Sequence, residues 1–354
     1  MRRFLHSRFN ALDPYDTSEE LETMRGDYIR LNTNESPFAP SAKVIERAKE
    51  AAGTLNFYCD PDCTKLREKL SPLMNVKPSE IVFGNGSDEI LNIIFMAFCE
   101  HGAAFPDITY SFYKILAKFH GVDFATVPLD ENFRVSPDDY KNLDARTIFI
   151  ANPNAPTGIS STLADVEKII VQNPDSLIVI DEAYVDFGGE SAKDLIHKYK
   201  NLIVVRTFSK SRSMAGGRLG WCMTCEELAK NINDIKNTFT PYNINAMTQA
   251  AALAILEDEA ATQANIKLIK AVRDNVKSRL REMGFEVLDS SSNFLFARHE
   301  KFSGEKIFES LKRRGIMVRH FERPEKISDF NRITIGTAEQ MQKFLEALKG
   351  AMSE

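Results

Sequence analysis

One short stretch of the chain gathers groups that could hold an anion beside a reactive amine. The sequence VVRTFSKSRSMAGGRLGW, residues 204–221, leaves an apolar run and then places Lys210 among hydroxyl and guanidinium groups. Short basic and hydroxyl-rich stretches are common on protein surfaces, where they form solvated loops. The alternative is an anion site in which one lysine is set aside for chemistry.

A second stretch indicates where an anion would bind. The apolar run EIVF, residues 80–83, is followed by Gly84-Asn-Gly-Ser-Asp-Glu89 and then by a helical pattern. Free backbone N–H groups and the helix dipole make such a helix start a phosphate site. A dinucleotide fingerprint would need a third glycine where Glu89 stands, and Walker A would need Gly-Lys-Ser/Thr. The pattern therefore predicts a site for one phosphate rather than for a nucleotide.

A third stretch adds an acid. The run LIVI, residues 177–180, ends in Asp181-Glu-Ala-Tyr184, and a lone acid at a strand end is often only a turn or cap residue. Taken with Lys210 and the phosphate site, however, Asp181 completes the set that pyridoxal phosphate requires. That set is a Schiff-base lysine, an acid for the pyridinium nitrogen and donors for the phosphate.

The elements that must position these groups alternate between strands and helices from about residue 79 to residue 209. Such alternation predicts an α/β fold with a mostly parallel sheet and helices on its faces, and ligands bind at the carboxyl ends of such strands. After Pro241 a long helical pattern, residues 245–284, leads into a smaller α+β region. The expected domains are an N-terminal arm (1–30), a large domain (31–240), and an interdomain helix with a small domain (241–354).

The expected elements before residue 241 are strands at 80–84, 147–153, 176–183 and 201–209, with helices at 87–102, 163–172 and 192–200.

Four motifs in order give the chain a family resemblance. GNGSDEIL, NPNAPTG, DEAY and RTFSKSRSMAGGRLGW resemble the motifs of fold-type I pyridoxal-phosphate aminotransferases. LNTNESPFAPS, NFYCDP and RITIGT extend the resemblance over nearly the whole chain, and it is closest to the histidinol-phosphate aminotransferases.

The resemblance implies a role for each matching residue. Lys210 would hold the cofactor as a Schiff base and then move a proton between Cα and C4′, and Asp181 would keep the pyridine nitrogen protonated. Tyr110 would stack on the ring, and Tyr58 would reach the cofactor phosphate of a neighbouring subunit in a homodimer. The remaining phosphate ligands would be Gly86, Ser87, Asp88, Ser209 and Arg218.

Two departures from the family pattern concern the ring hydroxyl and the substrate side. Ala155 stands where the family has the asparagine beside the ring hydroxyl, which leaves Asn154 or Tyr184 to make that contact. Losing one partner at the ring oxygen should raise the pKa of the Schiff base, because the oxygen's negative charge is then less well shared. The segment that begins at Asn34, a substrate-binding candidate, carries Phe38 and Ala39 where the family has tyrosine and glycine.

The expected substrate carries an anionic end group. Arg332 and Arg319 resemble the family's anion-binding residues, and a guanidinium grips carboxylate or phosphate in a bidentate manner. Tyr15 resembles an arm tyrosine that closes over the substrate from the other subunit. These residues favour an anionic end group such as phosphate, but they do not select an imidazole ring. The resemblance to the histidinol-phosphate aminotransferases makes the leading expectation an aminotransferase acting on L-histidinol phosphate and 2-oxoglutarate. The alternatives are a threonine-phosphate decarboxylase-like lyase, an aminotransferase for another amino acid, and a non-catalytic cofactor-binding protein.

The bulk composition bounds the partners. A net charge of -5 over 354 residues argues against a nucleic-acid groove, and no apolar run is long enough to span a membrane. The start of the chain lacks the continuous apolar core of a secretory signal, and five cysteines suit a reducing compartment, so a cytoplasmic enzyme is expected. Cys222 and Cys225 form a CxxC pair without nearby histidines, and no metal site is predicted.

Overall fold

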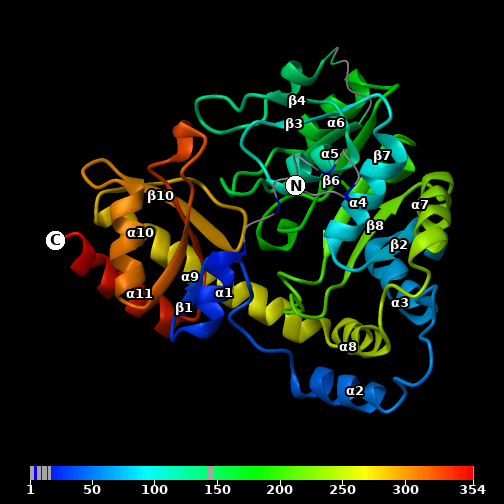
Figure 1. Cartoon of the computed structure of the whole chain (residues 1–354), viewed down its shortest axis with the longest axis horizontal. Helices are drawn as coiled ribbons and strands as arrows, with labels where there is room; N and C mark the ends of the chain where they lie inside the picture. The colour runs from blue at the N-terminus through cyan, green and yellow to red at the C-terminus, as the bar shows by residue number, and fades with distance from the viewer. Residues whose placement is uncertain are drawn as a thin grey trace.

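The computed structural model describes residues 4–5, 9, 14, 17–141, 143 and 147–353. These residues form two lobes, each built around its own sheet (Figure 1). The α/β architecture with a large lobe and a smaller α+β lobe is confirmed. None of the helices in the described part of the chain is both long and apolar enough to cross a membrane.

The sheet of the large lobe has seven strands in the order β2-β8-β7-β6-β5-β3-β4. All pairs from β7 to β4 are parallel, and β8 runs antiparallel to both of its neighbours, so β2 points the same way as β7. The carboxyl ends of β2, β5, β6 and β7 therefore lie at one edge. The strands are β2 Ile81–Gly84, β3 Ala103–Pro106, β4 Phe124–Val127, β5 Thr147–Ala151, β6 Leu177–Asp181, β7 Leu202–Thr207 and β8 Gly220–Thr224.

Helices cover both faces of this sheet. Alternation along β6 sends Ile178 and Ile180 into one hydrophobic cluster and Val179 into another, as the period of two requires. Helix α4 begins at Ser87, directly after β2, and packs on the Val179 face. The helices of the large lobe are α2 Ala42–Ala52, α3 Thr64–Met74, α4 Ser87–Phe98, α5 Phe112–His120, α6 Leu163–Gln172, α7 Glu226–Phe239 and α8 Ala246–Leu256.

The small lobe has a five-stranded sheet in the order β1-β11-β12-β10-β9, in which only β1 and β11 pair in parallel. Helices α9, α10 and α11 pack their apolar side chains against this sheet and form the core of the small lobe. Its elements are α1 Ser18–Arg25, β1 Ile29–Leu31, α9 Glu259–Glu282, β9 Phe285–Val287, β10 Phe294–His299, α10 Gly304–Arg313, β11 Ile316–His320, β12 Asn331–Thr334 and α11 Ala338–Ala351.

The long helical pattern at residues 245–284 is two helices rather than one. Helix α8 packs on α2 and α3 of the large lobe, whereas α9 runs from beside α8 into the small lobe (Figure 1). The break falls at residues 257–258, because the two helices bury their apolar sides in different cores. The domain boundaries at residues 30 and 240 stay predictions; α8, which follows residue 240, still packs on the large lobe, and the chain passes into the small lobe with α9.

The helix predicted at residues 192–200 is wrong in type. The structure has only a short 3-10 helix, Lys193–His197, with Ile196 as its one fully buried side chain. The carboxylate of Glu182 accepts hydrogen bonds from the Ala192 N–H and the Ser191 hydroxyl just before it. Those bonds tie the start of the segment to the end of β6, which leaves it too short to develop an amphipathic face.

Candidate active site

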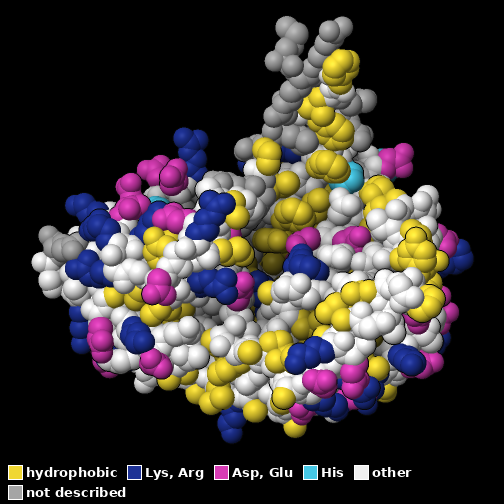
Figure 2. All heavy atoms as spheres, turned by 60° about the horizontal axis from the view of Figure 1, so that its bottom comes forward, with side chains coloured by type: hydrophobic (Ala, Val, Ile, Leu, Met, Phe, Trp, Pro, Cys, Tyr) yellow, Lys and Arg dark blue, Asp and Glu magenta, His cyan; other side chains and the backbone are white. Residues whose placement is uncertain are grey.

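Three strand ends meet around one cavity of about 390 Å³. Asp181 is the last residue of β6, Lys210 follows β7, and Ser87 opens α4 after β2. Figure 2 shows the surface hollowed between the two lobes. The lining residues are Glu20, Met24, Thr33, Glu35, Ser87, Asp88, Tyr110, Ala151, Pro153, Ala155, Asp181, Ala183, Tyr184, Thr207, Ser209, Lys210, Ala215, Gly216 and Arg218.

Asp181 presents a buried carboxylate to this cavity. Its Oδ2 accepts a 2.9 Å hydrogen bond from the Tyr113 hydroxyl, and its Oδ1 accepts one of 3.1 Å from the Ala183 N–H. Burial raises the pKa of the Asp181 carboxyl to about 6, although both hydrogen bonds act in the opposite direction. In the described part of the chain, the polar partners of the Asp181 carboxylate are thus a hydroxyl and a backbone N–H, neither of which is a cation. A protonated ring nitrogen in the cavity would supply the missing cation.

The loop between β2 and α4 forms a cradle that only glycines permit. Gly86 has a φ of +82°, and a Cβ there would lie 2.6 Å from an Nη of Arg218. A Cβ on Gly220 of the neighbouring strand β8 would lie 2.2 Å from the Ser87 nitrogen. The first N–H groups of α4 have no partner within the helix and are therefore available to an anion. This geometry fits a phosphate group.

Asp88 organises the wall of the cradle through its carboxylate. One oxygen accepts a 2.9 Å hydrogen bond from the Tyr110 hydroxyl, and the other pairs with Arg218 at 3.0 Å. Since a carboxylate repels phosphate, Asp88 can serve a bound phosphate only through its backbone N–H while its side chain orients Arg218 and Tyr110. Ser209 lies nearby, with its hydroxyl 2.9 Å from that of Thr207.

The side chain of Lys210 reaches across to the chain segment that follows β1. Its Nζ donates a 3.1 Å hydrogen bond to the Thr33 carbonyl and lies 5.9 Å from the centre of the Tyr184 ring. The Tyr184 hydroxyl accepts a 2.9 Å hydrogen bond from the Asn34 amide, and Thr334 donates to the amide oxygen at 3.0 Å. Lys210, Tyr184 and Asn34 are therefore brought together, as the sequence predicts.

Asn154 is placed differently from what a ring contact requires. It is not among the residues that line the cavity, and its amide group is engaged within its own surroundings. The Nδ2 donates to the Ile108 carbonyl and the Thr157 hydroxyl, each at 3.0 Å, and the Oδ1 accepts from Thr109 at 2.8 Å. Of the two candidates for the ring hydroxyl, only Tyr184 has its side chain at the cavity.

The two arginines lie beside each other on adjacent strands of the small lobe. Arg319 of β11 pairs in register with Arg332 of β12. Arg332 donates a 2.7 Å hydrogen bond to the Asn32 carbonyl, one residue before the carbonyl that Lys210 uses. Arg319 forms an ion pair of 2.8 Å with Glu19 of α1. Neither arginine lines the cavity itself, and the Asn32–Asn34 segment joins Arg332 to it.

Of the two tyrosines predicted to act between subunits, the structure describes only Tyr58, which does not line this cavity. Tyr58 is 82% exposed and stacks on Tyr242, with the ring centres 4.4 Å apart. Leu55 and Phe57 beside it are also exposed, so the α2–α3 connection carries an apolar patch. Tyr15 lies outside the described residues.

Sequence reasoning missed several residues that the fold brings to the site. Tyr113 holds Asp181 although it lies 68 positions away, and its one signal in the sequence is the spacing of three from Tyr110. Thr33 offers only a backbone carbonyl, which no side-chain pattern can reveal. Gly220 matters solely through its closeness to Ser87.

The cysteines take no part in the site. Cys222 is fully buried in β8, and burial raises the pKa of its thiol to about 12, so it is an unreactive protonated thiol. Among the described residues, no group of three or more His, Cys, Asp or Glu side chains is arranged to hold a metal.

Two lobes, a lysine and an acid at neighbouring strand ends, and a phosphate cradle define a fold-type I pyridoxal-phosphate-dependent transaminase. The family model for class I and II aminotransferases matches residues 26–348, and the chain belongs to that family.

The chain is similar along almost its whole length to proteins named histidinol-phosphate aminotransferase. The one from Marinomonas sp. is 42% identical over 353 residues, which is 99% of each chain, and the one from Brachyspira hyodysenteriae matches equally well. The crystal structure of the Clostridium acetobutylicum enzyme of that name has a TM-score of 0.84 at 28% identity, covering 92% of this chain and 99% of the other. The Sinorhizobium meliloti enzyme, solved with pyridoxal-5′-phosphate, has a TM-score of 0.88 at 24% identity, covering 99% and 98%, and supports the fold.

Proposed function

We propose that this chain transfers the amino group of L-histidinol phosphate to 2-oxoglutarate, giving imidazole-acetol phosphate and L-glutamate. The observation that carries the proposal is the Asn32–Asn34 segment, whose successive carbonyls accept hydrogen bonds from Arg332 and Lys210. An anionic group held at Arg332 would therefore lie beside the lysine. The full-length similarity to histidinol-phosphate aminotransferases supports phosphate as that group.

Each cavity residue has a distinct task with pyridoxal phosphate bound. Bound pyridoxal phosphate supplies an electron sink that stabilises negative charge at the substrate Cα. Asp181, as a carboxylate, would hold the proton on the ring nitrogen, and the Tyr184 hydroxyl would hold the ring hydroxyl. The start of α4 binds the phosphate with Ser209 and Arg218. Tyr110, whose hydroxyl is fixed by Asp88, packs against the ring face.

Lys210 anchors the cofactor covalently through Nζ. With substrate and cofactor bound, the same nitrogen would be the group that accepts the proton from the substrate Cα and returns it. The Thr33 carbonyl, which accepts a hydrogen bond from Nζ, lies on the segment that also holds Asn34, so this carbonyl would keep the free amine at the cavity. Arg332 orients the substrate by its anionic end, and Arg319 can join once the substrate anion displaces Glu19.

We infer that the working unit is a cytoplasmic homodimer with shared active sites. The exposed apolar patch at Leu55, Phe57, Tyr58 and Tyr242 would be covered by the second subunit. Tyr58 would then reach the cofactor phosphate of that subunit, and the Tyr15 arm would cover its substrate. All five cysteines are unpaired, which supports a reducing compartment.

The decisive experiment adds L-histidinol phosphate to the yellow holoenzyme without a keto acid. A transaminase should lose its yellow colour as the cofactor takes up the amino group, and 2-oxoglutarate should restore it. A holoenzyme that stays yellow with L-histidinol phosphate but bleaches with another amine would reassign the substrate. Release of carbon dioxide from threonine phosphate would reassign the reaction to a lyase.

A further inference from the structure

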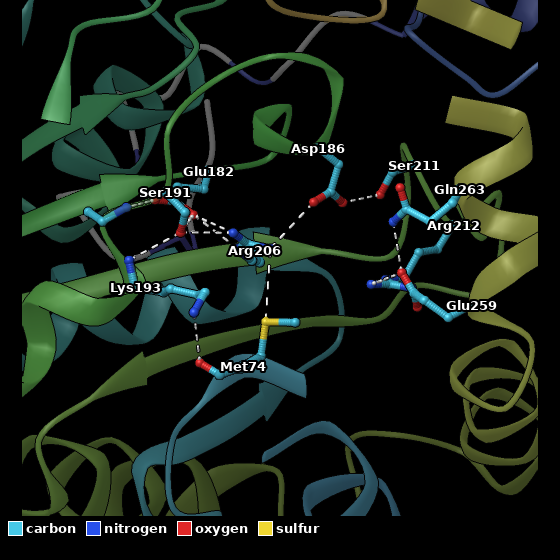
Figure 3. Close-up of polar contacts among 11 residues, drawn as sticks. Met74, Glu182, Asp186, Ser191, Lys193, Arg206, Ser211, Arg212, Glu259 and Gln263 are labelled. Atoms are coloured by element: carbon cyan, nitrogen blue, oxygen red, sulfur yellow. Dashed lines mark hydrogen bonds and ion pairs between the residues drawn. The ribbon is translucent and has the colours of Figure 1, made fainter. Parts of the chain in front are cut away.

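A polar network with buried Arg206 and Glu182 at its centre lies on the face of the large sheet opposite to Asp181. Asp181 pairs in register with Val205, so the next residues, Glu182 and Arg206, turn to the other face. We call Arg206, Glu182, Asp186, Ser191 and Ser211 the Arg206 network (Figure 3).

Arg206 is the centre of this network and is 7% exposed. Its Nε and Nη2 lie 3.0 and 2.9 Å from Oε2 of Glu182, and Nη2 also donates to Ser191 at 2.9 Å. Its Nη1 pairs with Asp186 at 3.4 Å. The guanidinium thus joins the residue that follows Asp181 to an acid in the 3-10 helix Val185–Phe187.

The network ends on the turn that carries Lys210. Ser211, the very next residue, is 4% exposed and donates a 2.5 Å hydrogen bond to Oδ2 of Asp186. Arg212 is equally buried and pairs with Glu259 at the start of α9 at 2.7 Å. Figure 3 shows the two carboxylates on separate elements: Asp186 is in the 3-10 helix Val185–Phe187, and Glu259 is the first residue of α9. The side chains of the two residues after Lys210 are therefore each fixed by a carboxylate that does not line the cavity.

Such an arrangement is better suited to fixing geometry than to adding stability. Buried ion pairs often stabilise a fold no more than apolar residues of the same volume, because desolvation offsets the attraction. What the Arg206 network does supply is a chain of short contacts from the strand end with Asp181 to the turn with Lys210. Misplacing a reacting group by about 1 Å can slow a reaction by about a hundredfold.

We propose that the Arg206 network positions Lys210 relative to Asp181, with Asp186 and Ser211 as the direct positioning residues. The inference rests on the proposed role of Lys210 as the covalent anchor of the cofactor. Asp186 holds the Ser211 hydroxyl, and Arg206 holds Asp186 against Glu182. The network therefore fixes where the Lys210 side chain leaves the backbone, and none of its residues lines the cavity.

The test measures covalent capture of the cofactor without any substrate. Cofactor-free protein is mixed with pyridoxal phosphate, borohydride is added at set times, and mass spectrometry gives the fraction of Lys210 that is modified. Affinity for pyridoxine phosphate, which lacks the aldehyde, is measured in parallel. Ser211→Ala and Asp186→Asn should slow capture by roughly tenfold to a hundredfold and leave the affinity for pyridoxine phosphate within about twofold.

Thr224→Val is the matched control. Thr224 is fully buried at the far end of the β7–β8 pair, and its hydroxyl donates a 2.7 Å hydrogen bond to the Leu202 carbonyl, so the variant also loses one buried hydroxyl contact. It should capture the cofactor at the wild-type rate. Equal slowing in the control, or a parallel loss of pyridoxine phosphate affinity in Ser211→Ala, would assign the network to general stability and overturn the proposal.

Two further outcomes are separable. If Asp186→Asn does not fold, Ser211→Ala alone decides, because it removes a single hydroxyl, and an unchanged capture rate would refute positioning. If the wild-type protein itself shows no adduct at Lys210, the proposed function fails rather than this inference.

Discussion

The hydroxyl of Tyr113 donates a 2.9 Å hydrogen bond to Oδ2 of Asp181, and both side chains are buried. Tyr113 belongs to α5 and Asp181 ends β6, so the bond ties a helix to the sheet edge at the floor of the cavity. Burial raises the pKa of the Tyr113 hydroxyl well above its ordinary value, so Tyr113 stays a hydrogen-bond donor at any pH the protein tolerates. It therefore favours the ionised form of Asp181, the form that a protonated ring nitrogen requires.

Asp181 should make the stability of the cofactor-free protein depend on pH. Burial raises the pKa of its carboxyl from 3.8 to about 6, so the folded state binds this proton more tightly than the unfolded state does. Its contribution is therefore fully present below about pH 4 and is lost as the pH rises to about 6. The loss is at most about 3 kcal/mol, since one pKa unit corresponds to about 1.4 kcal/mol. The free energy of unfolding in urea should fall by up to that amount between about pH 4 and pH 6 in the wild type, relative to its change in Asp181→Asn. Parallel plots of this free energy against pH for the two proteins would contradict the prediction.

Tyr113→Phe should raise the pKa of Asp181 further. The substitution removes a hydrogen bond that lowers this pKa, and it leaves the ring in place. The pH below which the protein loses affinity for the cofactor should therefore move upward, with little change well above that pH. Cofactor titrations over a pH series measure this. A uniform loss of affinity at every pH would instead mean that the hydroxyl serves packing alone.

Lys210→Ala should abolish covalent capture of the cofactor. The variant should bind pyridoxal phosphate without a borohydride-reducible bond to the protein, and turnover should fall by roughly 10²–10⁴-fold as the proton-transfer group is lost. Visible absorption before and after borohydride, with transaminase assays, measures both effects. A yellow variant that borohydride still fixes to the protein would transfer the anchoring role to another lysine.

Gly220→Ala should weaken cofactor binding through the phosphate cradle. The new Cβ would lie 2.2 Å from the Ser87 nitrogen, so either the β2–α4 loop or β8 must move. Such overpacking costs about 1–3 kcal/mol and should lower affinity for the cofactor by a corresponding factor. Gly53→Ala, outside the cavity, is the control, because a Cβ at Gly53 approaches nothing closer than the Glu50 carbonyl oxygen at 3.3 Å. Dissociation constants for pyridoxal phosphate, measured by equilibrium titration, test the prediction. Equal affinities in Gly220→Ala and the wild type would show that the loop moves at no cost in free energy.

Arg332→Ala should damage substrate use far more than cofactor retention. Its guanidinium donates to the Asn32 carbonyl, and Arg332 does not line the cavity, so the variant should keep its colour through dialysis. Truncating a charge that pairs with a substrate anion costs about 2–5 kcal/mol, which should appear in kcat/KM for L-histidinol phosphate. Arg298→Ala, which breaks an exposed pair with Glu286, is the control. Equal loss of colour and of kcat/KM in Arg332→Ala would make Arg332 a structural residue.

The sequence alone determined the α/β class and the three strand ends that carry the site. Residues that follow neighbouring parallel strands must meet at one edge of the sheet, so Asp181 and Lys210 could be placed together from their positions after apolar runs. Ser87 could be added because a glycine-rich turn opens its helix. The same pattern misjudged residues 192–200, because propensity does not reveal that Glu182 ties the segment to the sheet.

Only the tertiary structure decided which side chains contact one another. Asn154 and Tyr184 are both candidates for the ring hydroxyl, and only the folded chain shows that the Asn154 amide is bonded to Ile108, Thr109 and Thr157. Likewise, no spacing predicts that Tyr113 reaches Asp181 or that the Asn32–Asn34 segment joins Arg332 to Lys210. Local sequence sets strand direction and helix starts through backbone hydrogen bonding and hydrophobic period. Contacts between distant elements depend on how whole layers pack, which is a property of the folded chain.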